Sequence, residues 1–493
     1  MSSQDWTQPL GLITITDAMY RLTALSIAST LVLVPSPLRA DPMEKIGEPH
    51  TGLIRSVFVG ASFTNSQGLD NGVNCLKSSA TTVVDSADIP SRAKLLKATL
   101  YVAGSLLDDG LDFQNPDIQI FDAAGSAFGD PDDEALYTLA RQEATKSVSF
   151  LPPGTTTPIT VTAPGDAPNI TGFYEDATAG TPGNVAFYVT PFDVTEVMNN
   201  QGGGALDGTY TVSDIRADVC WGLEVSCDDP GDPPSCGTPH AKANASFGLL
   251  LIFEDPSLPP SSITVFEGLQ HWVGGELLLQ LSTPHVISDP PVGTLAMLAL
   301  EGDLTSPQVI TDTAPCGGQE YIRVHVTDDP EAVPLCLVDD DNPVGNIFNS
   351  TINVQNLGPG ENRPVCTLAP HQCCNPLTNT RCGETGIDID QFSISSALVP
   401  GAKNIEVSLG TGDDVVALGV VVVSAGVFRP VLEADSRVTA LTGVEGAAQL
   451  GAIFEYSVAL SNTGNPTSSA AEMASSAVAA GSTSHVVMPA PAS

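Results

Sequence analysis

Residues 244–268, NASFGLLLIFEDPSLPPSSITVFEG, decide the fold class of this chain. An apolar strand, Phe247–Phe253, is followed by a Pro-rich corner at Asp255–Pro260 and by an alternating strand at Ile263–Phe266. Near the C-terminus, Phe454–Leu460 forms another alternating run, which ends in an Asn/Gly turn at Asn462–Asn465. Short strands separated by turns of this kind are typical of β-sandwiches. Neither stretch contains a catalytic motif, so both favour a secreted surface protein over an enzyme.

Similar β-rich runs recur along the chain between Gly, Pro, Asp and Asn turns. They lie at 56–63, 94–103, 117–121, 147–150, 159–162, 186–189, 209–214, 249–253, 263–266, 276–281, 293–299, 319–325, 350–354, 387–394, 405–409 and 415–428. Helical periodicity is nearly absent, and the best helix candidate is an insertion at 132–146. The sequence therefore predicts an all-β protein with one or two large β-sandwich, jelly-roll-like domains.

The order of these runs suggests several regions. Residues 41–280 are predicted to form a first sandwich, and 281–430 either a second sandwich or the second half of one large unit. A short module follows at 431–465. After Asn465 the composition becomes rich in Ala, Ser, Thr, Pro and Gly, so 466–493 are predicted to be an unstructured tail.

The strongly negative net charge of the chain limits the kinds of partner that it can bind. The chain has 57 acidic and 18 basic residues, a formal net charge of -39. A surface this acidic would repel a phosphate backbone, so we expect no nucleic-acid partner. The acidity is typical of a solvated surface and could also attract divalent cations.

The N-terminal region predicts export. Residues 1–18 contain two Asp and no basic residue, which is unlike the start of a signal peptide. From Met19 the pattern fits: Arg21 is followed by the mostly apolar run Leu22–Val34 and by a cleavage site after Ala40. We therefore predict that 1–40 comprise an extension and a signal peptide, with Met19 as the start. The mature chain would be secreted or held at the cell surface, without a transmembrane span.

Ten cysteines follow the predicted signal peptide, and we expect them to form disulfides. The alternative is zinc, but neither of the two cysteine clusters has C-x-x-C spacing, although His371 lies beside the second. The clusters are Cys220/Cys227/Cys236 and Cys366/Cys373/Cys374/Cys382. The pairing cannot be read from the spacing. The disulfide candidates are Cys75, Cys220, Cys227, Cys236, Cys316, Cys336, Cys366, Cys373, Cys374 and Cys382.

Several oxygen-rich loops could bind calcium, which prefers carboxylate and carbonyl ligands. The alternative is that each loop is an ordinary turn, since Asp, Gly and Pro favour turns by themselves. None matches a complete EF-hand loop. The candidate ligands are Asp108, Asp109, Asp112, Asp339, Asp340 and Asp341, the last followed by Asn342, with further acidic loops at 130–133 and 228–232.

No catalytic motif is present: the chain has no H-E-x-x-H, no G-x-S-x-G and no Walker-type loop. Its seven histidines are scattered, and the pair His271-Trp272 is more typical of packing than of a site. The main alternative function is a carbohydrate-binding or carbohydrate-active extracellular protein, with Trp221, Trp272 and Tyr188 as candidate platforms.

Four blocks together resemble a known group of proteins. They are 89–104 (IPSRAKLLKATLYVAG), 192–214 (with FDVTEV and GTYTVSD), 247–268, and 387–430 (from IDIDQFSISS to VFRP). In the same order, these blocks are similar to large secreted proteins of myxobacteria and related bacteria, some of them labelled adventurous gliding motility proteins. In that group the blocks precede surface repeats of unknown function with an Ig-like sandwich fold.

The resemblance implies that 431–465 is an incomplete Ig-like module, because only the first half of such a repeat is present. The module would then dock on the preceding domain, pair with another chain, or result from truncation. The export signal, the disulfide-type cysteines, the β-turn rhythm and the missing catalytic motifs predict a non-enzymatic secreted or surface-attached protein with an adhesive or scaffolding role. The resemblance alone adds a gliding-associated role. The expected partner is a cell-surface or matrix component, including a glycan.

Overall fold

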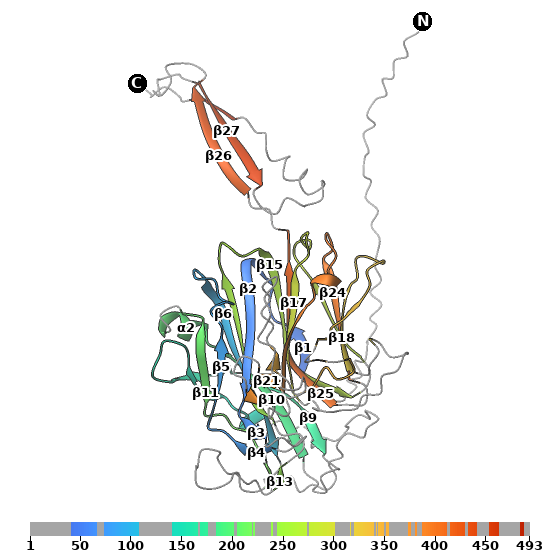
Figure 1. Ribbon diagram of the computed structural model, residues 1–493. Coiled ribbons are helices and arrows are strands. Elements are labelled where there is room, and N and C mark those ends of the chain that lie inside the picture. Colours follow the sequence, from blue (N-terminus) through green and yellow to red (C-terminus); the bar gives the residue numbers. More distant parts are fainter. Residues whose placement is uncertain are drawn as a thin grey trace, which may run out of the picture. The chain divides into compact units, whose positions relative to one another are not determined.

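The computed structural model describes a largely β-stranded chain and confirms the all-β prediction (Figure 1). The described residues are 41–66, 73–107, 141–165, 168–175, 184–201, 205–218, 220–221, 238–239, 244–273, 276–300, 316, 320–339, 342, 344–349, 352–353, 373–375, 380–381, 387–411, 415–428, 432–440, 453–462 and 484–487.

One large sheet organises the molecule. Its main path is β20 (Ile352–Asn353), β23 (Ile387–Ser393), β17 (Gly293–Leu300), β25 (Val415–Gly426), β15 (Pro260–Val273), β2 (His50–Ser62), β14 (Ala245–Glu254), β6 (Lys94–Leu107), β10 (Asn184–Asp193) and β9 (Asn169–Glu175). β1 (Asp41–Lys45) also pairs with β15. All neighbours are antiparallel except β20 and β23. Strands from both predicted sandwich regions therefore share one sheet, while a boundary near residue 281 stays a prediction.

The sheet changes direction where β15 meets β2. β15 pairs with β25 from Ser261 to Val273, but with β2 only through 260–263, opposite 50–53. Beyond that point β2 pairs with β14. Strands that share only their ends form the corners of folded sheets. The Pro-rich segment between β14 and β15 lies at this corner and separates the sheet into two halves, β2-β14-β6-β10-β9 and β15-β25-β17-β23-β20.

Two smaller sheets cover these halves. The first contains β5 (Ser79–Val84), β11 (Gly208–Ser213), β7 (Ser147–Leu151) and β8 (Ile159–Thr162); the second contains β16 (Glu276–Ser282), β24 (Asn404–Thr411), β18 (Glu320–Val326) and β19 (Leu335–Cys336). Each smaller sheet shares an apolar core with one half of the large sheet. Each such pair is a β-sandwich.

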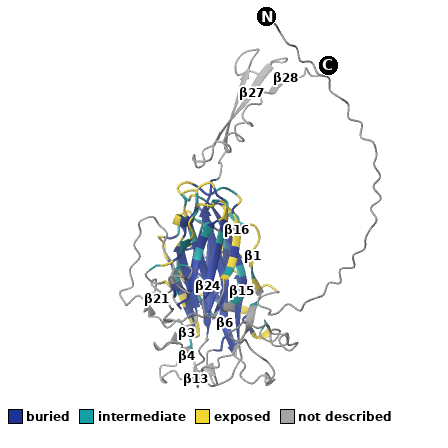
Figure 2. Cartoon of the chain, turned by 90° about the vertical axis from the view of Figure 1, so that its right-hand side faces the viewer, coloured by how far each residue is buried: buried dark blue, intermediate teal, exposed yellow. Residues whose placement is uncertain are grey.

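A third core joins the two sandwiches. It contains residues from β2, β6, β10 and β14 together with residues from β15, β17, β23 and β25, among them Phe58, Tyr101, Leu298 and Ile389. The second faces of the two halves therefore pack against each other, giving four layers. Figure 2 shows the continuous buried interior and the exposed residues at its surface and ends.

Glycines permit this close approach. A Cβ placed on Gly60 of β2 would lie 2.1 Å from Ile389 Cδ1 and 2.3 Å from the Phe247 carbonyl oxygen. Cβ atoms on Gly248 and Gly419 would also meet side chains of the opposite half, at 2.9 Å and 3.0 Å. Packing this tight explains why the inner strands are buried on both faces and read as nearly continuous apolar runs.

The remaining described elements are short or peripheral. They are β3 (Thr64–Ser66), β4 (Val73–Leu76), α2 (Thr195–Gln201), β12 (Cys220–Trp221), β13 (Thr238–Pro239), β21 (Cys373–Asn375), β22 (Thr380–Arg381), the 3-10 turn η3 (Ser395–Ala397), and a sheet of β26 (Leu432–Ala440), β27 (Ile453–Asn462) and β28 (Ser484–Val487). β27 contains the alternating run 454–460. β28 is a short strand inside the predicted tail. The predicted strand at 117–121 and most of the helix at 132–146 lie outside the described residues, although 141–143 are helical.

Replacing Gly60 with alanine should destabilise the folded state by about 2–3 kcal/mol, because the added carbon would overlap a backbone oxygen in a close-packed layer. Gly165 is the matched control, since a Cβ there would meet nothing within 4 Å. Urea unfolding of Gly60→Ala and Gly165→Ala measures the difference. Equal stability of the two variants would contradict the close approach of the layers.

Candidate functional site

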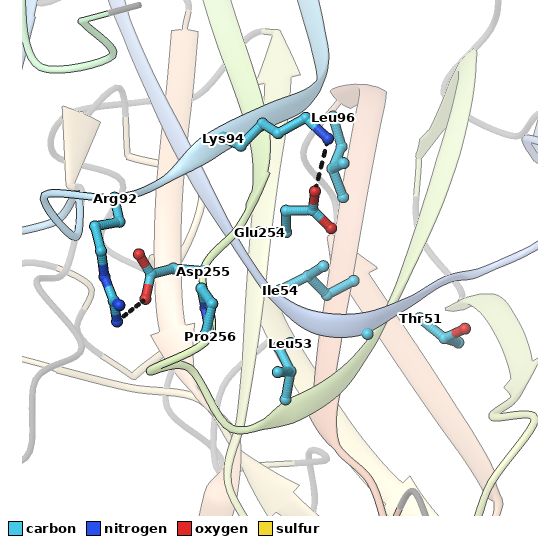
Figure 3. Close-up of a pocket in the computed structure, with 10 residues that line it drawn as sticks. Thr51, Leu53, Ile54, Arg92, Lys94, Leu96, Glu254, Asp255 and Pro256 are labelled. Carbon is cyan, nitrogen blue, oxygen red and sulfur yellow. Dashed lines mark hydrogen bonds and ion pairs between the residues drawn. The ribbon is translucent and has the colours of Figure 1, made fainter. Parts of the chain in front are cut away.

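A half-open pocket lies at one end of β2, β6 and β14, beside the Pro-rich corner (Figure 3). Its volume is about 580 Å³, within the range of small-molecule sites. It is lined by Thr51, Gly52, Leu53, Ile54, Arg92, Lys94, Leu96, Glu254, Asp255 and Pro256. The apolar side chains come from β2, β6 and the turn after β14, while the charged ones come from the start of β6, the preceding loop and the end of β14.

The charged groups of the pocket are paired with each other. Lys94 Nζ lies 2.9 Å from Glu254 Oε1, and Arg92 Nη2 lies 3.7 Å from Asp255 Oδ1. The Asp255 side chain is 1% exposed, whereas that of Arg92 is 69% exposed. Formal charges therefore balance inside the pocket, although the chain as a whole is strongly acidic. This arrangement suits a polar ligand better than a strongly charged one.

Asp255 also shapes the corner. Its Oδ1 accepts hydrogen bonds from the Ser257 backbone N–H at 2.7 Å and from the Ser257 hydroxyl at 2.5 Å. These hydrogen bonds, with a smaller contribution from the Arg92 charge, lower the pKa of Asp255 below its usual value. Asp255 N–H donates to the Leu53 carbonyl, which ties the turn to β2. The carboxylate is thus engaged mainly in building the turn, and the lining contains no His, Cys or Ser that could act as a nucleophile or base with it.

A second polar group lies between the two sandwiches. The Tyr101 hydroxyl of β6 donates to Glu267 Oε1 of β15 at 2.6 Å. Burial raises the pKa of Glu267, while the Tyr101 hydrogen bond and the Lys97 charge oppose that rise. Burial, followed by the Glu267 charge, raises the pKa of Tyr101. The pair joins the two sandwiches within a layer formed mostly by apolar side chains.

A third group, of buried carboxylates, lies below residues 342–349. Glu320 of β18 and Asp388 and Asp390 of β23 are each at most 1% exposed. Amides of the covering segment donate to them: Phe348 N–H to Glu320 (3.2 Å), Asn349 N–H to Asp388 (2.9 Å) and the Asn342 side chain to Asp390 (3.3 Å). The sequence pattern predicts the strand but not this group, because alternating Ile and Asp in IDID normally places Asp in solvent.

The structure tests little of the calcium prediction. Asp339 accepts a hydrogen bond from the Asn342 backbone N–H at 2.8 Å, as in a turn. Among the described residues, no three His, Cys, Asp or Glu side chains are placed to hold a metal ion. The other candidates, Asp108, Asp109, Asp112, Asp340 and Asp341, and the loops at 130–133 and 228–232 lie outside the described residues. Calcium binding therefore stays a prediction.

One predicted disulfide is present. Cys316 and Cys336 are bonded, with their Cα atoms 5.5 Å apart, and tie residue 316 to edge strand β19. The backbones of Cys75, Cys220, Cys373 and Cys374 lie in described strands, but their side chains do not belong to the described part. Cys227, Cys236, Cys366 and Cys382 lie wholly outside it.

Of the three proposed aromatic platforms, the structure describes the side chain of Tyr188 alone. Tyr188 is fully buried in the first core, and its hydroxyl bonds with Thr145 at 2.7 Å. The prediction that Tyr188 could be a glycan platform is therefore wrong: the ring faces inward on β10 and lies over Gly104. His271 is packed into β15, and burial lowers its pKa to about 4. The side chains of Trp221 and Trp272 lie outside the described part.

Tyr101→Phe should cost about 1–2 kcal/mol at neutral pH, because it leaves the buried Glu267 carboxylate without this donor. The cost should shrink at acid pH, where Glu267 becomes neutral: its raised pKa disfavours the charged folded state, and that penalty disappears as pH falls. Urea unfolding at both pH values measures the effect.

Tyr210→Phe is the matched control, since it removes a buried hydroxyl that donates to a neutral carbonyl, that of Leu206, at 2.6 Å. Its cost should not change in the same way with pH. Equal pH dependence of the two variants would contradict the role given to Glu267.

His271 should make the protein less stable in acid. Its folded pKa, about 4, lies below the unfolded value of about 6.5. The folding free energy linked to His271 is therefore fully present above about pH 6.5. It is lost as pH falls toward 4, by up to about 3 kcal/mol. His271→Gln should flatten this part of the pH–stability curve, measured by thermal or urea unfolding. An unchanged slope in the variant would contradict the burial of a neutral imidazole.

Comparisons with known proteins do not assign a family. No family model matches the chain, and no curated protein matches it. Among solved structures, a chain from the atomic structure of Sulfolobus Turreted Icosahedral Virus is 10% identical, with coverage of 76% of this chain and 91% of that one and a TM-score of 0.18. A chain from the Sputnik virophage structure is 9% identical, with coverage of 92% and 94% and a TM-score of 0.17. Scores this low support no conclusion about fold or function.

Proposed function

We propose that this chain is an exported, non-enzymatic β-sandwich protein that acts as a rigid scaffold at a cell surface or in a matrix. The observation that carries the proposal is the apolar core between the two sandwiches. It makes the described β layers one stiff body, as a load-bearing or spacing element requires. A catalytic protein would instead be expected to gather reactive groups in a cleft.

Two further observations support an extracellular setting. The Cys316–Cys336 disulfide belongs to the chemistry of oxidising compartments. The high negative charge keeps an exported protein soluble and separated from like-charged copies. The gliding-associated role rests on the sequence resemblance alone. Within the described residues, no helix is long and apolar enough to cross a membrane.

The pocket at the corner fits the same proposal. Its two ion pairs bridge the loop before β6, the start of β6 and the end of β14, so its charged groups are engaged with each other. The pocket is therefore assigned to stabilising the corner and, at most, to holding a small polar ligand, rather than to catalysis.

Export and scaffolding can be tested in the native host. We expect the mature chain in the surface or culture fraction, beginning at Asp41 by N-terminal sequencing and migrating faster on gels without reductant. A deletion strain should show weakened surface attachment, motility or envelope integrity. A reduced protein confined to the cytosol would contradict export, and a deletion strain normal in all three respects would contradict the scaffolding role.

A further inference from the structure

The outer face of the sheet β5-β11-β7-β8 carries hydroxyl groups in place of charges. One residue in two on these strands points into the first core; examples are Ala80, Val212, Phe150 and Val161. The alternate residues point outward, every second one from Ser79, Thr209, Ser147 and Thr160. We call these eleven residues the hydroxyl face: nine are Ser or Thr, the other two are Val83 and Leu151, and none is buried.

The register of the strands arranges these hydroxyls in rows. Ser213 pairs with Ser79 on one side and with Ser149 on the other, and Ser149 pairs with Thr160. The next row contains Thr81, Thr211 and Leu151. Hydroxyls in a row are about 4.8 Å apart from strand to strand, and successive rows are about 6.7 Å apart along a strand.

Hydrogen bonds already link hydroxyls of this face. Thr81 Oγ1 and Thr211 Oγ1 lie 3.1 Å apart, and Ser149 donates to Asp214, a carboxylate at the rim. Each hydroxyl can donate and accept, so the face keeps free hydrogen-bonding capacity of both kinds.

The opposite outer sheet provides an internal comparison. On the outward face of β16-β24-β18-β19, Arg323 lies 2.7 Å from Glu276, and Gln280 donates to Glu406 at 3.0 Å. On this outer sheet, charged and amide side chains make the outward face soluble. The absence of charge from all eleven positions of the other sheet calls for a different account.

The chemistry of the hydroxyl face suits a neutral partner with hydroxyls of its own. The eleven positions carry no charge, and the Asp214 carboxylate at the rim disfavours a polyanion. Its donors and acceptors match those of sugar hydroxyls, and its rows match a partner that repeats. It has no aromatic ring, so contact would depend on hydrogen bonds and on the Thr methyl groups rather than on ring stacking.

The size of the face argues against a second copy of the chain as the occupant. Four strands of four to six residues span about 300 Å², well below the roughly 800 Å² that each partner buries in a standard protein interface. A polymer can bind a face of this size and gain avidity by engaging several protein molecules along its length.

We propose that the hydroxyl face binds a neutral polysaccharide. The inference rests on the proposed function, since it names the partner that the scaffold holds. The contact is made by the Ser and Thr rows, and it is independent of the pocket at the corner and of the predicted aromatic platforms.

Affinity electrophoresis of the purified mature protein tests the proposal. Native gels contain dextran, hydroxyethyl cellulose or a soluble β-1,3-glucan, with carboxymethyl cellulose as the anionic counterpart, and pull-down on microcrystalline cellulose adds an insoluble probe. We expect at least one neutral polymer to retard or retain the protein. Retardation by none of them, or equal retardation by the anionic polymer, would overturn the proposal.

Paired variants locate the contact. Thr81→Glu with Thr211→Glu should reduce affinity at least tenfold, whereas Leu278→Glu with Ser282→Glu, which add the same charge to the opposite outer sheet, should leave it unchanged. Thr81→Val with Thr211→Val keeps the β-branched shape, removes only the hydroxyls and should also weaken binding. Thermal unfolding verifies that each variant is folded.

Equal effects of the two charged pairs would overturn the assignment of the face. If the Thr81/Thr211 variants sediment differently from the unchanged protein in the absence of polymer, the face mediates self-association. That result would also overturn the assignment. Failure of glycan binding leaves the proposed function standing, because export, disulfide state and the deletion phenotype are measured without any polysaccharide.

Discussion

The packing of the two halves of one sheet against each other is the constraint on which the other features depend. An antiparallel sheet usually keeps one face in solvent, but here the central strands are buried on both faces. Leu249 and Leu251 of β14 point into the first core, while Leu250 and Ile252 point into the core between the sandwiches. β14 and β25 are therefore apolar at nearly every position, and glycine is needed where backbones approach most closely. Polar chemistry is then restricted to the outer sheets, the strand ends and a few isolated groups.

The isolated polar groups in this large interior must lose their contact with water. Tyr101 and Glu267 bring a hydroxyl and a carboxylate into the central layer, where their pairing limits the desolvation cost of each. Asp388 and Asp390 enter the second sandwich, and their oxygens accept hydrogen bonds from the segment 342–349. Buried polar groups that accept hydrogen bonds from specific donors fix how layers and loops are placed relative to one another. The same restriction leaves the outer faces as the broad surfaces open to a partner, and the two differ in chemistry: one is charged and the other carries hydroxyls.

Much of the fold could be predicted from residue patterns. The alternating run at 159–162 and the apolar runs within β14 and β25 predict strands that the structure contains. The partners of these strands could not be predicted, because the corner depends on a four-residue pairing between β15 and β2 that leaves no local signal. Asp388 and Asp390 were missed for a related reason: alternation shows that two faces differ, but not that a distant loop covers the polar one. Tyr188 was misread because its inward direction is set by the register of β10 rather than by its neighbours in sequence.

Native-state hydrogen exchange, resolved by peptide, tests the central claim most directly. If the core between the sandwiches makes the layers one cooperative body, amides of β2 and β14 should exchange with the same opening free energy as those of β17 and β25. The protected strands of both halves should then lose protection together as denaturant is added. Two separate classes, with one sandwich opening while the other remains protected, would contradict the account.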